Sequence, residues 1–116
     1  MKLVNLTRGS VLAETVAVAE TPGSRRSGLL GTDSLPGSRG LLIVPCRHVH
    51  TFGMRYPIDL VFIDEAWKVK RVVHGIKPGR LSPVVLGSRA VLEIAAGRAR
   101  DSGTGEGDLL DALPAD

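Results

Sequence analysis

The sequence contains few aromatic residues and almost no cysteine. It has two phenylalanines, one tyrosine, one tryptophan and one cysteine among 116 residues. Any hydrophobic core must therefore consist mainly of Val, Leu, Ile and Ala side chains. The single cysteine, Cys46, excludes an intramolecular disulfide, so a reducing compartment is permitted.

Long apolar runs are also missing. No run approaches the roughly 20 apolar residues that a membrane-spanning helix needs, and Asn5, Thr7 and Arg8 interrupt any signal-peptide core at the start of the chain. We therefore expect a soluble, cytoplasmic protein without membrane insertion. The length and the ordinary fractions of hydrophobic (43%) and charged (23%) residues predict a single domain over residues 1–116, with residues 111–116 as a flexible tail.

The sequence has no concentrated basic stripe, although its net charge is +3. The arginines are scattered, only Arg25 and Arg26 are adjacent, and outside the central segment no aromatic residue lies among basic residues. Nucleic-acid backbones favour a continuous basic surface, and single strands favour stacking aromatics. Nucleic acid is therefore disfavoured as a partner, and a small molecule or a peptide is the expected ligand. The oligomeric state is left open.

The remaining pattern predicts a mainly β (α+β) fold. Short apolar or β-branched segments alternate with glycine, proline and serine turns, which favours a compact β-barrel or sandwich of six to eight short strands. One short helix is predicted where Thr21 supplies an N-cap and Pro22 a first helical position.

Most of the chemically distinctive side chains lie in residues 46–64, "CRHVHTFGMRYPIDLVFID". If this segment begins as a strand, His50, Phe52 and Met54 share one face and Arg55 lies on the other. A polar side chain beside an apolar wall is typical of small-molecule pockets. The competing interpretation makes Phe52 and Met54 ordinary core residues, with His50 near the surface.

Two acidic residues interrupt apolar segments. Asp59 divides the run over residues 58–63, so its side chain must face solvent, be paired or have a shifted pKa. It can accept backbone hydrogen bonds, or it can lie at a pocket rim, paired with Arg55 or His50. Glu93 interrupts "VLEIAAG", where alternation toward solvent accounts for it.

The spacing Cys46-x-His48-x-His50 raises the question of a metal site. On a strand it would place one sulfur and two imidazoles on the same face, and Asp59 would be available to complete the ligand set. However, two histidines at this spacing occur often by chance, and Pro45 can displace Cys46 from the strand. We therefore assign no metal ligands, and the sequence identifies no cofactor.

Several segments together resemble domain-of-unknown-function family 192. The central signature of that family is matched by His50, Phe52, Met54, Arg55, Pro57, Asp59, Phe62 and Asp64. "TPGSRRSGLL", "GLLIV" and "VLEIAAG" are similar to its early helix and two of its strands, although Leu30 and Ala95 depart from the pattern. The resemblance covers about residues 16–108 and implies a small β-rich domain with a short helix and no established activity. Cys46 and His48 lie outside the signature.

We predict a non-catalytic module that binds a small ligand or peptide around residues 50–64. His50, Arg55 and Asp59 would orient the ligand, and Phe52 and Met54 would form an apolar wall. The alternative is a hydrolase- or lyase-type enzyme in which His50 is the general base or a metal ligand and Asp59 orients it. A third hypothesis is an assembly partner that uses an exposed sheet edge. The enzyme hypothesis requires His50 and Asp59 within hydrogen-bond reach of each other.

Overall fold

The computed structural model describes residues 1–114, and these form eight short strands and two short helices. In chain order the elements are β1 (Lys2–Asn5), β2 (Ser10–Ala13), β3 (Thr15–Ala19), α1 (Pro22–Ser27), β4 (Arg39–Ile43), β5 (Ile58–Ile63), β6 (Val69–Ile76), β7 (Ala90–Ala95), α2 (Arg98–Asp101) and β8 (Leu110–Leu113). The predicted mainly β fold is confirmed, with one helix more than expected. Neither helix of the described chain is long and apolar enough to cross a bilayer.

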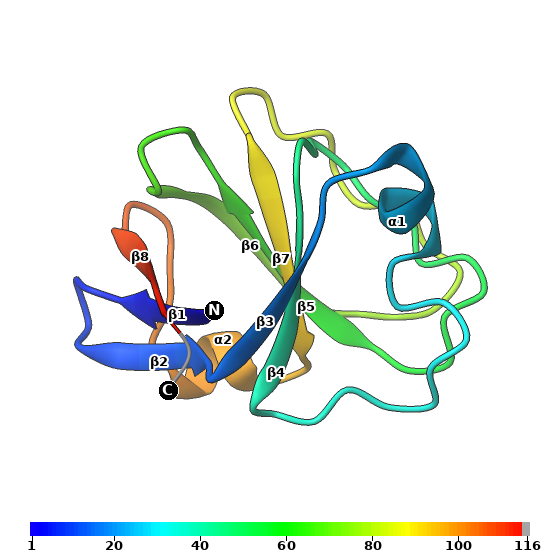
Figure 1. Ribbon diagram of the computed structural model, residues 1–116, viewed down its shortest axis with the longest axis horizontal. Coiled ribbons are helices and arrows are strands. Elements are labelled where there is room, and N and C mark those ends of the chain that lie inside the picture. Colours follow the sequence, from blue (N-terminus) through cyan, green and yellow to red (C-terminus); the bar gives the residue numbers. More distant parts are fainter. Residues whose placement is uncertain (115–116) are drawn as a thin grey trace.

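The strands form two sheets rather than a closed barrel within residues 1–114. The small sheet has the order β2-β1-β8, and the large sheet has the order β3-β4-β7-β5-β6. Strand β7 lies at the centre of the large sheet and pairs antiparallel with β4 and β5. Figure 1 shows the small sheet and α2 at one end of the molecule, and α1 with the long loops at the other.

Two apolar clusters cover the two faces of the large sheet. Because side chains alternate along β7, Leu92 and Ile94 pack with Leu3 of the small sheet, whereas Val91 packs with Leu60 beneath the long loops. We call these sides the small-sheet face and the loop face. Helix α2 belongs to the small-sheet face, because its Ala99 is fully buried in that cluster.

Helix α1 begins where the sequence predicts. The hydroxyl of Thr21 accepts a hydrogen bond from the Ser24 N–H, and the Ser24 hydroxyl accepts one from the Thr21 N–H, each at 3.0 Å. Pro22 occupies the first helical position. The helix ends at Gly28, whose φ of +47° favours glycine, and the chain then turns toward the large sheet.

The predicted flexible tail is wrong for residues 111–113. These residues belong to β8, which pairs antiparallel with β1 along its whole length. The pairing satisfies backbone groups of the first strand, and Leu110 is 2% exposed in the core at the start of β8. The sequence alone does not show that the two chain ends meet. Residues 115–116, also part of the predicted tail, lie outside the described residues.

A buried polar cluster connects the two ends of the chain. The amide of Asn5 donates hydrogen bonds to Thr104 Oγ1 (3.1 Å) and to Asp108 Oδ2 (3.0 Å). The Gly105 N–H (2.9 Å) and Arg8 Nε (3.3 Å) donate to the same Asp108 oxygen. Burial alone would raise the pKa of Asp108, but these hydrogen bonds lower it below the ordinary value. The cluster therefore holds an ionised carboxylate in the protein interior.

Replacing Asn5 by alanine should lower the free energy of unfolding by about 2 kcal/mol near neutral pH, because Asp108 loses a buried partner. Since the pKa of Asp108 is lowered by folding, its stabilisation is complete above the ordinary aspartate pKa of about 4 and is lost as the pH falls. The difference between wild type and Asn5→Ala, measured by urea denaturation, should therefore narrow below about pH 4. The exposed Ser34→Ala change is the control and should cost less than about 0.5 kcal/mol. Equal stability of Asn5→Ala and wild type near neutral pH would contradict this role.

Candidate functional site

The segment that carries most of the distinctive side chains is a loop, so the prediction of a strand at its start is wrong. Residues 44–57 connect β4 to β5, and His50 makes only an isolated bridge to Leu81. The loop packs against residues 77–82 instead, where the Thr51 hydroxyl donates to the Lys77 carbonyl (2.6 Å) and accepts from the Arg80 N–H (2.9 Å). Backbone hydrogen bonds from the Thr51 N–H to the Arg80 carbonyl (2.8 Å) and from the Gly79 N–H to the Thr51 carbonyl (2.9 Å) accompany them, but the pairing does not extend into a strand. His50, Phe52 and Met54 therefore do not share a strand face.

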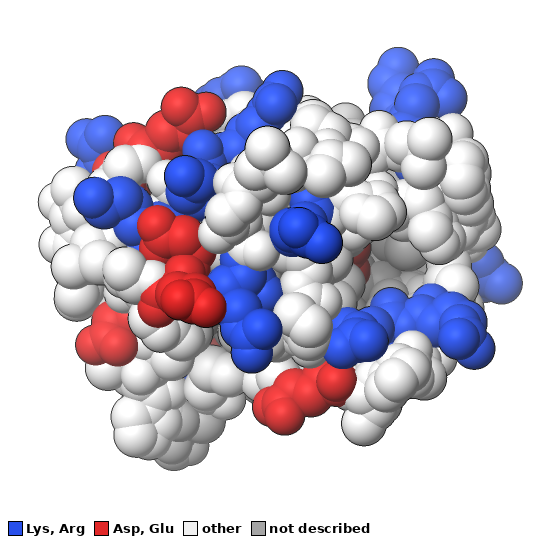
Figure 2. Space-filling view, turned by 90° about the horizontal axis from the view of Figure 1, so that it is seen from above, with Lys and Arg blue, Asp and Glu red and all other residues white. Residues whose placement is uncertain are grey.

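This loop forms one wall of a groove of about 1110 Å³ on the loop face of the large sheet. The other walls are the end of α1, the turn between β5 and β6, and the residues before β7. Figure 2 shows a hollow on this side of the molecule with basic side chains around it. A volume of this size accommodates a small organic molecule or a short peptide.

Apolar and polar side chains both line the groove. The apolar ones are contributed by the end of α1, by β4 and by the loop that follows it, and they include Leu29, Ile43, Val49 and Met54. Among them lie the Cys46 thiol and the Glu93 carboxyl. An apolar surface with a few polar groups is the usual composition of a ligand site.

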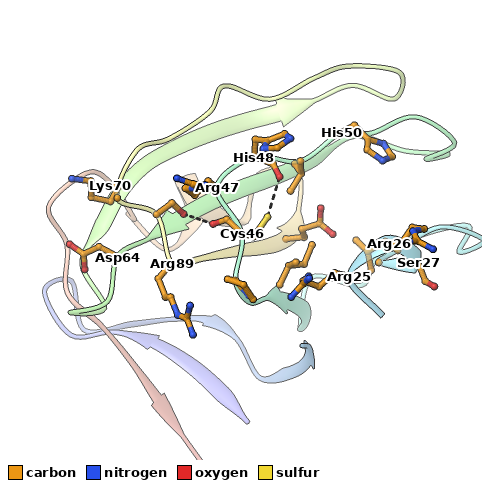
Figure 3. Close-up of a pocket in the computed structure, with 18 of the residues that line it drawn as sticks. Arg25, Arg26, Ser27, Cys46, Arg47, His48, His50, Asp64, Lys70 and Arg89 are labelled. Carbon is orange, nitrogen blue, oxygen red and sulfur yellow. Dashed lines mark hydrogen bonds between the residues drawn. The ribbon is translucent and has the colours of Figure 1, made fainter. Parts of the chain in front are cut away.

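Cys46 is half-buried, and its thiol donates a hydrogen bond to the His48 carbonyl at 3.1 Å (Figure 3). Burial raises the pKa of the Cys46 thiol and the nearby Glu93 carboxyl raises it further, although the His48 hydrogen bond and Arg25 act in the opposite direction. A thiol with a raised pKa is a poor nucleophile at neutral pH. Cys46 therefore lines the groove as a protonated thiol at neutral pH.

Glu93 lies on central strand β7 and projects from the loop face. Its registered neighbours on β4 and β5 are Leu41 and Leu60, both in the apolar cluster of that face. Its side chain lines the groove although the residue is only 5% exposed. Burial raises the pKa of the Glu93 carboxyl to about 7. The expectation that Glu93 faces solvent by simple alternation is wrong, because the small sheet covers one face of β7 and the long loops cover the other.

Five basic side chains border the groove: Arg25, Arg26, Arg47, Lys70 and Arg89. Figure 3 shows Arg25 and Arg26 coming from α1 on one side, and Lys70 and Arg89 on the opposite side. None of the five forms an ion pair with another residue of the described chain. Asp64 and Glu65 are the acidic residues at the border, so the basic charge predominates.

The structure separates the predicted ligand-binding residues. His50 and Met54 line the groove. Phe52 is 51% exposed and lies outside the lining, where its ring stacks on His50 with the ring centres 5.2 Å apart. Arg55 lies on the surface and pairs with Asp33. Only part of the predicted set therefore faces the groove.

Asp59 lies on the other side of the sheet. It is fully buried, and its registered partner on β7 is Ile94, which belongs to the small-sheet face. Its Oδ1 accepts a hydrogen bond from the Gly75 N–H (2.7 Å), and its Oδ2 accepts from the N–H groups of Gly97 and Ala99, each at 3.0 Å. Asp59 therefore joins the start of α2 to strands β5 and β6 of the large sheet.

The proposed catalytic pair is consequently absent. His50 lines the groove on the loop face, whereas the Asp59 carboxylate faces α2 on the small-sheet face. In the described part of the chain no hydrogen bond joins them, and backbone donors occupy both oxygens of Asp59. The enzyme hypothesis based on His50 and Asp59 does not fit this arrangement.

Within residues 1–114, no group of three or more His, Cys, Asp or Glu side chains is gathered closely enough to hold a metal ion. Cys46, His48 and His50 all border the groove, but their side chains are not brought together as a ligand set. Asp59, the proposed fourth ligand, is on the opposite face of the sheet.

Sequence reasoning missed Glu93 and the basic border of the groove. A signal for Glu93 was present, because a single acid divides the otherwise apolar strand "AVLEIA". For Arg47, Lys70 and Arg89 no signal was available, since these residues are far apart in the sequence and meet only after folding.

The model of domain-of-unknown-function family 192 (DUF192), described as "Uncharacterized ACR", matches residues 4–112. The chain belongs to the DUF192 family. The resemblance based on the central signature is thus confirmed. A search of curated proteins finds no match to this DUF192 chain.

Two crystal structures share the fold of this DUF192 protein. A protein of unknown function from Novosphingobium aromaticivorans superposes with a TM-score of 0.85 at 22% identity, covering 97% of this chain and 84% of the other. A protein from Sinorhizobium meliloti, whose description proposes a role in transcription regulation, superposes with a TM-score of 0.80 at 20% identity, covering 95% and 89%. At these identities the similarity establishes the fold alone.

Proposed function

We propose that this DUF192 chain is a binding module for a small anionic organic molecule, held in the groove on the loop face. The observation that carries the proposal is the border of five basic side chains without ion-pair partners in the described chain, around a volume of about 1110 Å³. Guanidinium groups bind carboxylates and phosphates in two-pronged geometry, which favours an acidic ligand.

The apolar lining supports an organic ligand rather than an inorganic ion. Ile43 and Val49 are almost fully buried, and Met54 is half-buried beside them. A ligand with a hydrocarbon part would cover these side chains while its acidic group contacts the border. The predicted binding module is kept in this proposal, but its site moves from residues 50–64 to the groove, of which His50 and Met54 form one wall. Two statements from the sequence remain predictions: nucleic acid is disfavoured as a partner, and the protein is cytoplasmic.

The test is a thermal-shift and titration screen with carboxylic acids, amino acids and sugar phosphates. We expect at least one class to raise the melting temperature of the wild-type protein. The double variant Arg47→Gln/Arg89→Gln should weaken binding of that class by at least about tenfold, because each charge-assisted contact contributes about 1.5–3 kcal/mol.

The control variant is Arg39→Gln/Arg100→Gln, which removes the same charge from exposed arginines outside the groove. It should change affinity by less than about threefold, because exposed charges act weakly at a distance in physiological salt. The proposal fails if no class binds, or if the two double variants weaken binding equally.

A further inference from the structure

We propose that Glu93 selects the ligand by binding a protonated amine, so that the molecule held in the groove carries an ammonium group as well as an acidic group. Free amino acids and ω-amino acids have this chemistry. The inference rests on the proposed function, because it takes the groove as the ligand site and the basic border as the partner of the acidic group.

Glu93 differs from the other buried acids of the chain. Asp59 and Asp108 each accept three hydrogen bonds within the described chain. The Glu93 carboxyl has neither a hydrogen bond nor an ion pair with any residue from 1 to 114, although the residue is only 5% exposed. No fully enclosed side-chain oxygen of these residues lacks a partner, so the Glu93 oxygens open onto the groove that the side chain lines. A largely desolvated carboxyl that makes no hydrogen bond within the protein loses part of its hydration without compensation. A donor supplied by a ligand would complete the hydrogen bonding of Glu93.

The position of Glu93 is fixed by its surroundings. Strand β7 is paired on both sides, by β4 and β5, so the backbone of Glu93 is held in the middle of the sheet. A Cβ atom on Gly28 would lie 3.9 Å from Glu93 Oε1, so the end of α1 passes close to the carboxyl. A binding group on a rigid strand needs little reorganisation when its ligand arrives.

The protein's own cations leave Glu93 available. Arg25, from α1, is close enough to act electrostatically on the neighbouring Cys46 thiol, but its guanidinium donates to the Glu20 carbonyl at 3.3 Å. The groove thus contains an unpaired acid among its apolar side chains and unpaired bases at its border. A ligand with an ammonium group and an acidic group would complement both.

Binding of an ammonium group should release a proton. The pKa of free Glu93 is raised to about 7 by burial, so below neutral pH the carboxyl is largely protonated. An ammonium ion favours the ionised carboxylate, which lowers the pKa of Glu93 and releases its proton to solvent. The other titratable or charged groups that line the groove are Arg25, Arg26, Cys46, Arg47, His48, His50, Asp64, Glu65, Lys70 and Arg89.

The test uses two matched pairs of probes, leucine with N-acetylleucine and ε-aminocaproate with caproate. Calorimetric titrations near pH 6 and near pH 8 measure the affinity of each probe. The amine-bearing member of each pair should bind roughly tenfold more weakly near pH 6 than near pH 8, because only about a tenth of Glu93 is ionised near pH 6. Titrations near pH 6 in buffers of different ionisation enthalpy should show proton release for the amine-bearing members. Any proton release that comes from His48 or His50 should occur equally with the probes that lack an amine, so these probes serve as its control.

Glu93→Gln should remove the proton release and weaken leucine binding near pH 8 by at least about tenfold. The exposed Glu106→Gln is the control and should leave both unchanged. If the amine-bearing and amine-free members bind wild type equally, or if Glu93→Gln behaves as wild type, the assignment of Glu93 is overturned while the anionic site stands. If neither pair binds at millimolar concentration, both this inference and the groove as a site for organic acids are overturned.

Discussion

Replacing Asp59 by alanine is expected to lower the free energy of unfolding by about 4 kcal/mol. The buried carboxylate accepts three backbone hydrogen bonds, and a hydrogen bond to a charged group contributes about 1.5–3 kcal/mol. Two of the donors, Gly97 and Ala99, lie at the start of α2, which has only four residues and depends on this contact. Water entering the vacated space recovers part of the loss.

Urea denaturation followed by circular dichroism measures this change, with Asp33→Ala as the control. Asp33 forms an exposed ion pair with Arg55, so its removal should cost less than about 1 kcal/mol. A loss of less than about 1 kcal/mol for Asp59→Ala would show that the carboxylate is not a structural anchor. Asp59 variants should weaken ligand binding only in proportion to their unfolded fraction.

Replacing Glu93 by glutamine is expected to raise the free energy of unfolding by about 3 kcal/mol above neutral pH. Burial raises the pKa of Glu93 from 4.5 to about 7, and each pKa unit corresponds to about 1.4 kcal/mol. Because the folded protein holds this proton more tightly than the unfolded chain, wild-type stability falls as the pH rises from about 4.5 to about 7. Glutamine does not titrate, so the stability of the variant lacks this pH dependence. The difference in free energy of unfolding between Glu93→Gln and wild type should therefore grow over this pH range and then level off.

Chemical denaturation of wild type and Glu93→Gln at several pH values between about 4 and 9 measures the difference directly. Subtracting the two curves removes the contributions of the histidines and of Asp108, which both proteins share. Glu106→Gln, at an exposed position, should follow the wild-type curve within about 0.5 kcal/mol. A constant difference between wild type and Glu93→Gln across this pH range would mean that Glu93 is not a desolvated acid. A gain in stability on removal of a charged residue is the pattern of a functional group retained at a cost.

Local signals in the sequence predicted the strands and the first helix well. Thr21 and Pro22 define the start of α1 through short-range capping, which depends on neighbouring residues alone. The apolar run over residues 58–63 forms β5 as expected. The prediction of a flexible tail failed for residues 111–113, because these residues pair with β1. This pairing joins residues more than 100 positions apart, and no local sequence pattern encodes such a contact.

The candidate site was predicted only in part, for a physical reason. The alternation rule assigns one face of a strand to solvent, and it failed for Glu93 because β7 is covered on both faces. The interpretation of Asp59 as a residue accepting backbone hydrogen bonds was available from its position in an apolar run, and the structure favours it over the pocket rim. The groove itself depends on how loops from four parts of the chain meet, so His50 and Met54 were found but their basic neighbours were not.

The most direct test of the groove as a ligand site is a nitrogen-15 NMR titration of the protein with leucine near pH 8. We expect the amide signals of residues that line the groove, including Gly28, Cys46 and Glu93, to shift with a common saturating dependence on concentration, while those of α2 and of Gly75 beside Asp59 stay unchanged. Shifts confined to the small-sheet face, or no shifts up to the solubility limit of leucine, would contradict the proposed site.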